Sequence, residues 1–133
     1  MADQKKALIV EDDVLMGMEL KDFIEGFDFQ VSRVIETGED AVQYARENKP
    51  DLILMDIRLK GKMDGIEASR QIRSSLSVPI IFLTGYKDAS TAQQIASIPN
   101  TYLFTKPYNP GTLGSAIEDI AAGRSHPPES SSR

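Results

Sequence analysis

Short runs of consecutive apolar residues recur along the chain, and the segments between them place apolar residues at helical spacing. A continuous apolar run is typical of a buried parallel strand, because helices cover both faces of a parallel sheet. We therefore predict strands at residues 7–10, 29–35, 51–55, 78–83 and 102–105. The segment 29–35 is the least apolar of these, as expected for a strand at the edge of a sheet.

Each predicted strand is followed by a segment with helical features. Residues 37–40 resemble a capping box, and Pro110 suits the first turn of a helix. The predicted helices are residues 14–27, 37–47, 66–73, 88–98 and 110–122. The repeated alternation of strand and helix predicts an α/β fold, a five-stranded parallel sheet with right-handed crossovers and helices on both faces. The common strand order for such units is 2-1-3-4-5, the flavodoxin-like (βα)5 arrangement.

Polar residues end four of the predicted strands: the pair Glu11-Asp12, then Asp56, Thr84 and Lys106. Ligands of an open parallel sheet bind beyond the carboxyl ends of its strands, so we expect these side chains to converge. Converging carboxylates repel one another, and a hard cation such as Mg²⁺ relieves this while also binding a phosphate oxygen. The pattern predicts a sheet edge that binds a divalent cation and handles a phosphoryl group.

Each of these residues also has an ordinary structural explanation. Acids that follow a strand are often solvated or cap the next helix. Thr84 is compatible with a cap of the turn that follows it, and Lys106 with a strand-end cation whose ammonium reaches solvent. The ordered set of all these residues favours the functional interpretation over the separate explanations.

Composition narrows the classes of function. A chain of 133 residues suggests one domain with a proper core. Cysteine is absent, which excludes a disulfide framework, a thiolate zinc site and a cysteine nucleophile. A net charge of −5 argues against nucleic acid as a partner. The chain contains neither a long apolar segment nor a secretory signal, so we expect a cytoplasmic protein with no membrane partner.

The C-terminal segment differs from the rest of the chain. Residues 124–133 lack apolar side chains and are predicted to be a disordered tail after a domain at 1–123. The only histidine, His126, lies in this tail, which excludes a Ser-His-Asp triad. The sequence also contains no Walker-A motif and no Gly-x-Gly-x-x-Gly motif.

With these motifs in place, the chain resembles a response-regulator receiver domain of two-component signalling over about residues 5–123. The motifs are the pair Glu11-Asp12, the acceptor-like Asp56, Thr84-Gly85 and Lys106-Pro107, with a cis peptide implied at the last. The resemblance implies that Asp12 and Asp56 give carboxylate ligands to Mg²⁺, that Glu11 acts directly or through water, and that Arg58 gives its backbone carbonyl. Asp13 is assigned no metal role.

The resemblance also implies a function. Asp56 would accept a phosphoryl group from the phosphohistidine of a histidine kinase, with Lys106 and Thr84 contacting the phosphoryl oxygens. Such a module catalyses only its own phosphotransfer and dephosphorylation and is not an enzyme in the usual sense. With no output domain in the sequence, we expect a single-domain regulator that signals by contact with an unknown downstream protein or acts as a phosphate sink.

Residues 79–86 are similar to the Pro-Phe-x-Phe-Ala-Thr-Gly-Tyr motif of a receiver subfamily nicknamed FAT GUY, with departures at Ile80 and Leu83. This resemblance implies a histidine kinase of the HWE type as partner. Most receivers carry an aromatic switch residue three positions before the strand-five lysine, where this chain has Leu103. Tyr102 precedes it and is expected to point to the opposite face of the strand.

Two other classes of protein remain as alternatives. A phosphatase of the haloacid-dehalogenase type also uses an aspartate nucleophile with Mg²⁺, but residues 56–59 lack the second aspartate of its motif. A flavin-binding flavodoxin needs a phosphate loop rich in serine, threonine and glycine after the first strand. The acidic residues 11–13 occupy that place.

Overall fold

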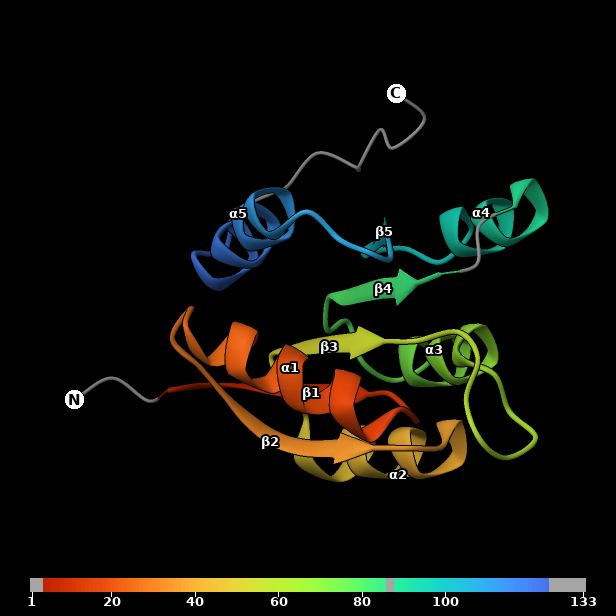
Figure 1. The fold of residues 1–133 in the computed structure, drawn as a ribbon. Coiled ribbons are helices and arrows are strands. Elements are labelled where there is room, and N and C mark those ends of the chain that lie inside the picture. The colour runs from red at the N-terminus through yellow and green to blue at the C-terminus, as the bar shows by residue number, and fades with distance from the viewer. Residues whose placement is uncertain (1–3, 86–87, 125–133) are drawn as a thin grey trace.

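The computed structural model describes residues 4–85 and 88–124. Within these residues, five strands form one parallel sheet in the order β2-β1-β3-β4-β5 (Figure 1). The strands are β1 (Lys5–Val10), β2 (Phe29–Ile35), β3 (Leu52–Met55), β4 (Ile80–Thr84) and β5 (Thr101–Thr105). The predicted fold class and strand order are confirmed, and β2, the least apolar predicted strand, lies at one edge.

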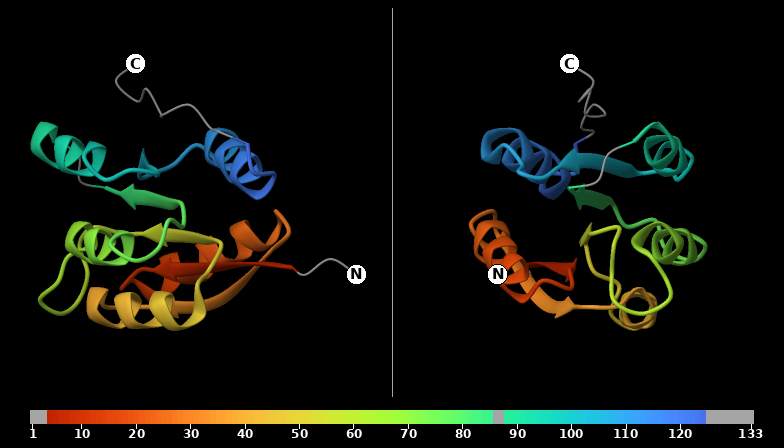
Figure 2. Two further views of the ribbon diagram at one scale, coloured as in Figure 1. Left: turned by 180° about the vertical axis from the view of Figure 1, so that it is seen from behind. Right: turned by 45° about the vertical axis from the view of Figure 1, so that its right-hand side comes forward.

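Helices alternate with the strands throughout the described residues. They are α1 (Val14–Glu25), α2 (Gly38–Asn48), α3 (Gly65–Arg73), α4 (Ala89–Ala96) and α5 (Pro110–Ala121). Each follows a residue whose side-chain oxygen accepts a hydrogen bond from an amide of the first turn, namely Asp13, Thr37, Asp64, Asp88 or Asn109. These caps satisfy amides that have no partner inside the helix. Helices α1 and α5 cover one face of the sheet, and α2, α3 and α4 cover the other (Figure 2).

The strands divide their side chains between two apolar cores. Leu8 and Val10 of β1 belong to the core under α2, α3 and α4, whereas Ala7 and Ile9 belong to the core under α1 and α5. Successive residues of a strand point to opposite faces. A strand covered on both faces therefore has no polar position, which explains the continuous apolar runs in the sequence.

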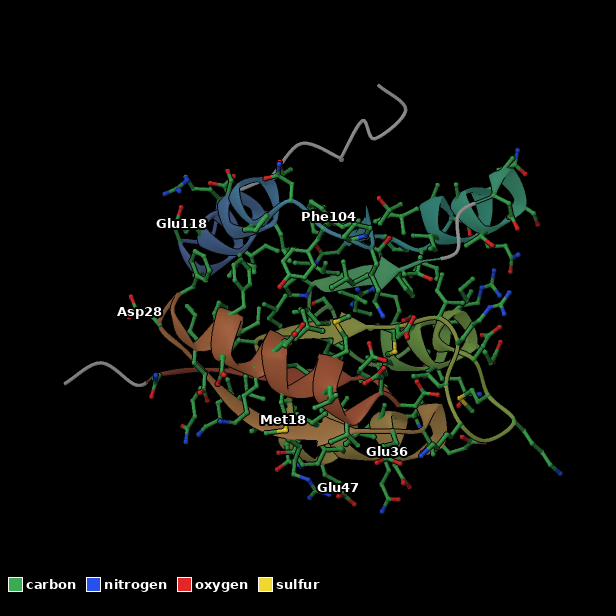
Figure 3. The ribbon with its side chains drawn as sticks, viewed as in Figure 1. Met18, Asp28, Glu36, Glu47, Phe104 and Glu118 are labelled. Atoms are coloured by element: carbon green, nitrogen blue, oxygen red, sulfur yellow. The ribbon has the colours of Figure 1, made fainter. Side chains whose placement is uncertain are left out.

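The same alternation separates Tyr102 from Leu103 on β5. Leu103 packs against the core that contains Ile95 of α4, and Tyr102 packs against the core that contains Leu113 of α5. Phe104 lies in the same core as Tyr102, on the side of β5 that faces α5 (Figure 3). The expectation that Tyr102 points away from the face of Leu103 is confirmed.

Several element boundaries differ from the prediction by one or two residues. Val78 and Pro79 precede β4 rather than opening it, although the carbonyl of Pro79 still accepts a hydrogen bond from the amide of Ile53 at 3.0 Å. Proline has no amide hydrogen with which to extend the ladder. Helix α4 is shorter than predicted, with Thr91 and Ile95 as its buried residues.

The predicted tail lies almost entirely outside the described residues. Arg124 is described, and its guanidinium forms an ion pair with Asp119 at 2.9 Å. The proposed disorder of the remainder, including His126, stays a prediction. In the parts of the chain that the structure describes, every helix is too short or too polar to cross a membrane.

Candidate functional site

Strand register brings the predicted site residues to one edge of the sheet. Val10 pairs with Met55 across β1 and β3, so Glu11 and Asp56 leave neighbouring strands at the same level. The amide of Asp56 donates a hydrogen bond to the carbonyl of Val10 at 2.9 Å, which extends this ladder by one residue. Lys106 joins from the other side, because its amide donates to the carbonyl of Thr84 at 2.9 Å.

Three carboxylates gather at this edge. One oxygen from each of Glu11, Asp12 and Asp56 lies within 4.8 Å of the others. Glu11 is 3% exposed, and Asp12 and Asp56 are half-buried. Three hard oxygen donors this close together suit a small divalent cation, which would offset their mutual repulsion. The set therefore fits the Mg²⁺ site that the sequence predicts.

Lys106 supplies positive charge to the same cluster. Its Nζ atom lies 2.9 Å from Oε1 of Glu11 and 3.4 Å from Oδ2 of Asp56, and its side chain is 19% exposed. Burial alone would lower the pKa of Lys106, but the hydrogen bond from its ammonium to Glu11 and the charges of Asp56 and Glu11 outweigh this and raise it. The explanation of Lys106 as a cation that simply reaches solvent does not fit this geometry.

Glu11 is the most buried acid of the cluster. Its Oε2 atom accepts a hydrogen bond from the amide of Asp13 at 3.1 Å, while Oε1 faces Lys106. Burial raises the pKa of Glu11 and the charge of Asp56 adds to this rise, whereas the bonds from Lys106 and Asp13 oppose it. The carboxylate of Glu11 is thus held in place at both oxygens.

Asp56 presents its two oxygens to different partners. Oδ1 accepts a hydrogen bond from the amide of Ile57 at 2.7 Å, and Oδ2 faces Lys106. The side chain is 11% exposed, so it is not completely closed off from solvent.

Two neighbours of the site were not identified from the sequence. A Cβ atom on Gly65 would overlap the backbone carbonyl of Asp56, and the Gly65 amide donates to the carbonyl of Ile57 at 2.7 Å. The loop after β3 thus folds back onto the end of β3 at a point that only glycine fits. The Asp64-Gly65 pair marks a helix start in the sequence, but nothing in it reveals this approach. Asp13, to which no metal role was assigned, caps α1 and fixes Glu11.

For Thr84 and Arg58, the structure gives a position at the same end of the sheet but does not test the predicted role. Thr84 ends β4 and is 2% exposed, and a contact of its hydroxyl with a phosphoryl group stays a prediction. Arg58 has an exposed side chain in the loop after β3, and the metal role of its carbonyl also stays a prediction. The Lys106-Pro107 bond is cis, as the sequence motif implied. Tyr86 lies outside the described residues.

Comparison with known proteins agrees with this geometry. A family model described as response regulator receiver domain matches residues 7–118. The chain is 33% identical over 111 residues to the phyllosphere-induced regulator PhyR of Methylorubrum extorquens, covering 83% of this chain and 41% of PhyR. It is 29% identical over 114 residues to the transcriptional regulatory protein PdtaR of Mycobacterium tuberculosis, covering 86% of this chain and 55% of PdtaR. The chain thus spans about half the length of these relatives.

Solved structures show the same likeness. The signal receiver domain of a modulated diguanylate cyclase from Desulfovibrio desulfuricans G20 superposes with a TM-score of 0.80 at 33% identity, covering 91% of this chain and 96% of that one. A two-component response regulator of the LuxR family from Aurantimonas sp. SI85-9A1 gives a TM-score of 0.82 at 28% identity, covering 92% and 88%. The family match covers most of the sequence and contains Glu11, Asp12, Asp56 and Lys106. The chain belongs to the response regulator receiver domain family of phosphoacceptor signalling modules.

Proposed function

We propose that Asp56 accepts a phosphoryl group from the phosphohistidine of a histidine kinase in a Mg²⁺-dependent reaction. The observation that carries this proposal is the position of Asp56, between the ammonium of Lys106 and the shared carboxylate cluster with Glu11 and Asp12. A carboxylate placed there has both a cation to neutralise the incoming phosphoryl oxygens and neighbours suited to a metal ion.

The chemistry follows from these positions. An oxygen of the Asp56 carboxylate bonds to phosphorus while the bond from phosphorus to the imidazole nitrogen breaks, and that electron pair remains on the imidazole. Lys106 balances charge on the phosphoryl oxygens, and Thr84 donates its hydroxyl to one of them. When bound by Asp12, Asp56, Glu11 and the carbonyl of Arg58, Mg²⁺ supplies further charge neutralisation. Catalysis is then positioning and electrostatics, as expected for a loose transition state.

The surface beside the acceptor is suited to a protein donor. Val14, Leu15 and Met18 are the large apolar side chains most exposed to solvent among the described residues, at 61%, 75% and 58%. All three lie on α1, which begins directly after the acidic residues, and Met18 lies away from α5 (Figure 3). We assign a histidine kinase to this surface, of the HWE type that residues 79–86 suggest. The reaction belongs in the cytoplasm, where such kinases present their phosphohistidine.

The phosphorylated domain would signal by contact with a downstream protein or compete for phosphoryl groups as a sink. Phosphorylation adds negative charge and acceptor oxygens next to Lys106, so the resting contacts of this lysine must be redistributed. A purified kinase and the domain separate the two outputs. Rapid return of the phosphoryl group to the kinase supports a sink, and a lasting acyl phosphate supports signalling by contact.

The test is labelling with acetyl phosphate in Mg²⁺, read by intact-protein mass. The wild type should gain one phosphoryl group, and Asp56→Asn should gain none. Asp22→Asn, which changes an exposed aspartate of α1, serves as the matched control and should label like the wild type. Stoichiometric labelling of Asp56→Asn would refute the acceptor assignment. Multiple turnover of a small phosphoester would point to a phosphatase instead.

A further inference from the structure

Three aromatic rings join α1 to the segment that carries Lys106. The ring of Phe23 lies 5.1 Å from that of Phe27 and 5.4 Å from that of Tyr108, measured between centroids. Both pairs are tilted or edge-on, the arrangements that aromatic quadrupoles favour. We call Phe23, Phe27 and Tyr108 the aromatic bridge. Its three members are half-buried and pack against the core under α1 and α5.

The two ends of the aromatic bridge are fixed to different parts of the molecule. At one end, a Cβ atom on Gly114 of α5 would come within 2.8 Å of the Phe27 ring, so this ring rests directly on the α5 backbone. At the other end, Tyr108 belongs to the short connection between β5 and α5, two positions after Lys106. Helix α1, which carries Phe23 and ends just before Phe27, faces this connection on the same side of the sheet (Figure 2).

Helix α1 also contacts the sheet edge that carries Glu11, Asp12 and Asp56. Asp13 caps this helix with its side chain, and its amide holds Oε2 of Glu11. Helix α1 and the aromatic bridge together therefore connect the backbone at Asp13 to the backbone near Lys106. They do so by a route separate from the ion pair between Lys106 and Glu11.

Lysine has a long and flexible stem, so the position of its ammonium depends on what holds its backbone and its charge. In the resting protein the ammonium is held by Glu11 and Asp56. The packed backbone shares this task in the resting protein, and its share grows during phosphotransfer, when the phosphoryl oxygens compete for the ammonium. This backbone is held by Thr84 through the Lys106 amide and by the ring of Tyr108 against Phe23.

We propose that Tyr108 and Phe23 are positioning residues for Lys106, which hold its ammonium over Asp56 while the phosphoryl group is transferred. This inference rests on the proposed function of Asp56. The ring of Tyr108, rather than its hydroxyl, holds the backbone near Lys106 in place, because the ring makes the contact with Phe23. Burial and the charge of Glu19 on α1 raise the pKa of the Tyr108 phenol, so this group stays neutral.

The kinetic test uses acetyl phosphate at saturating Mg²⁺. Tyr108→Leu should lower the labelling rate constant by about three- to tenfold, the range that loss of one aromatic pair allows. Phe23→Leu removes both pairs and should lower it at least as much. The final extent of labelling and the dissociation constant for Mg²⁺, measured by calorimetry, should not change. Tyr108→Phe keeps the ring and should label at the wild-type rate. Tyr44→Leu, which removes a half-buried ring on the opposite face, is the control and should label normally.

A double-mutant cycle shows whether Tyr108 acts through Lys106. In a Lys106→Met background, Tyr108→Leu should cause no further loss of rate, since the group it positions is gone. An additional loss of the same size, or a fall in Mg²⁺ affinity parallel to the fall in rate, would overturn the proposal and leave a general structural role.

A measurement on the resting protein separates this proposal from the proposed function. The ¹³C NMR signal of the Lys106 Cε group reports its ion pair with Glu11 without any phosphoryl donor. Tyr108→Leu should move this signal toward that of exposed lysines, and Tyr108→Phe should leave it in place. An unmoved signal in Tyr108→Leu would contradict the proposal even if Asp56 is labelled, whereas an unlabelled wild type would contradict the acceptor assignment alone.

Discussion

The Nζ atom of Lys106 lies closer to Glu11 than to Asp56, at 2.9 Å from Oε1 of Glu11 and 3.4 Å from Oδ2 of Asp56. Lys106 is thus paired more closely with Glu11 than with Asp56. A phosphoryl group on Asp56 would offer the ammonium new, more highly charged acceptors. If Asp56 is phosphorylated as proposed, competition between Glu11 and the phosphoryl oxygens for the one ammonium of Lys106 would rearrange the site.

Adjacent acids of the first loop should respond differently to loss of charge. Asp12→Asn removes a member of the carboxylate cluster and should weaken Mg²⁺ binding by at least about tenfold, with acetyl phosphate labelling reduced in parallel. Asp13→Asn is the matched control, because asparagine caps a helix as well as aspartate does. It should keep Mg²⁺ affinity near the wild-type value in calorimetric titration. Equal weakening by both substitutions would mean that general negative charge, rather than ligation, binds the ion. Chelation of the metal should stop labelling of the wild type.

Gly65 should tolerate no side chain. Gly65→Ala places a Cβ atom on the carbonyl of Asp56, so the end of β3 or α3 must shift. We expect a loss of about 1–3 kcal/mol in the free energy of unfolding, the usual cost of overpacking. Gly85→Ala is the control, since a Cβ there meets no atom within 4 Å. Urea denaturation of the two variants provides the comparison, and equal stabilities would show that the loop after β3 adjusts without cost.

The limits of sequence reasoning are visible in these residues. Glu11, Asp56, Thr84 and Lys106 were found because each ends an apolar run, and parallel strands bring such ends together whatever their separation in the chain. The contact of Gly65 with Asp56 and that of Tyr108 with Phe23 have no periodic signal. They depend on the paths of two loops relative to the sheet and to α1, which the sequence pattern does not encode.

Glu25 should make stability depend on pH. The amide of Val31 and the ammonium of Lys21 donate to this exposed carboxylate, each at 3.2 Å, and lower its pKa, the Val31 bond most. An acid whose pKa is lowered by folding stabilises the protein above its unfolded-state pKa, and this contribution is lost as the pH falls through the folded-state value. Glu25→Gln should therefore reduce the thermal midpoint at neutral pH and make no difference in acid.

The matched control for Glu25 is Glu118→Gln on the exposed side of α5 (Figure 3). Its effect on the thermal midpoint should be small at every pH. A difference between wild type and Glu25→Gln that persists unchanged into acid would show that the side chain acts by packing rather than by charge.

Replacing only Lys106 should destabilise the protein more than replacing both Lys106 and Glu11. Lys106→Met leaves Glu11, which is 3% exposed, without its cation, and we expect a loss of about 1–3 kcal/mol in the free energy of unfolding. In the double variant Lys106→Met with Glu11→Gln, the unpaired charge is gone, so most of that stability should return. Mg²⁺ should also stabilise Lys106→Met more than the wild type, because the ion replaces the missing positive charge. Urea denaturation with and without Mg²⁺ gives the free energy of unfolding of the wild type, Lys106→Met and the double variant. If the double variant is as unstable as Lys106→Met alone, the alkyl stem of Lys106 contributes more than its charge.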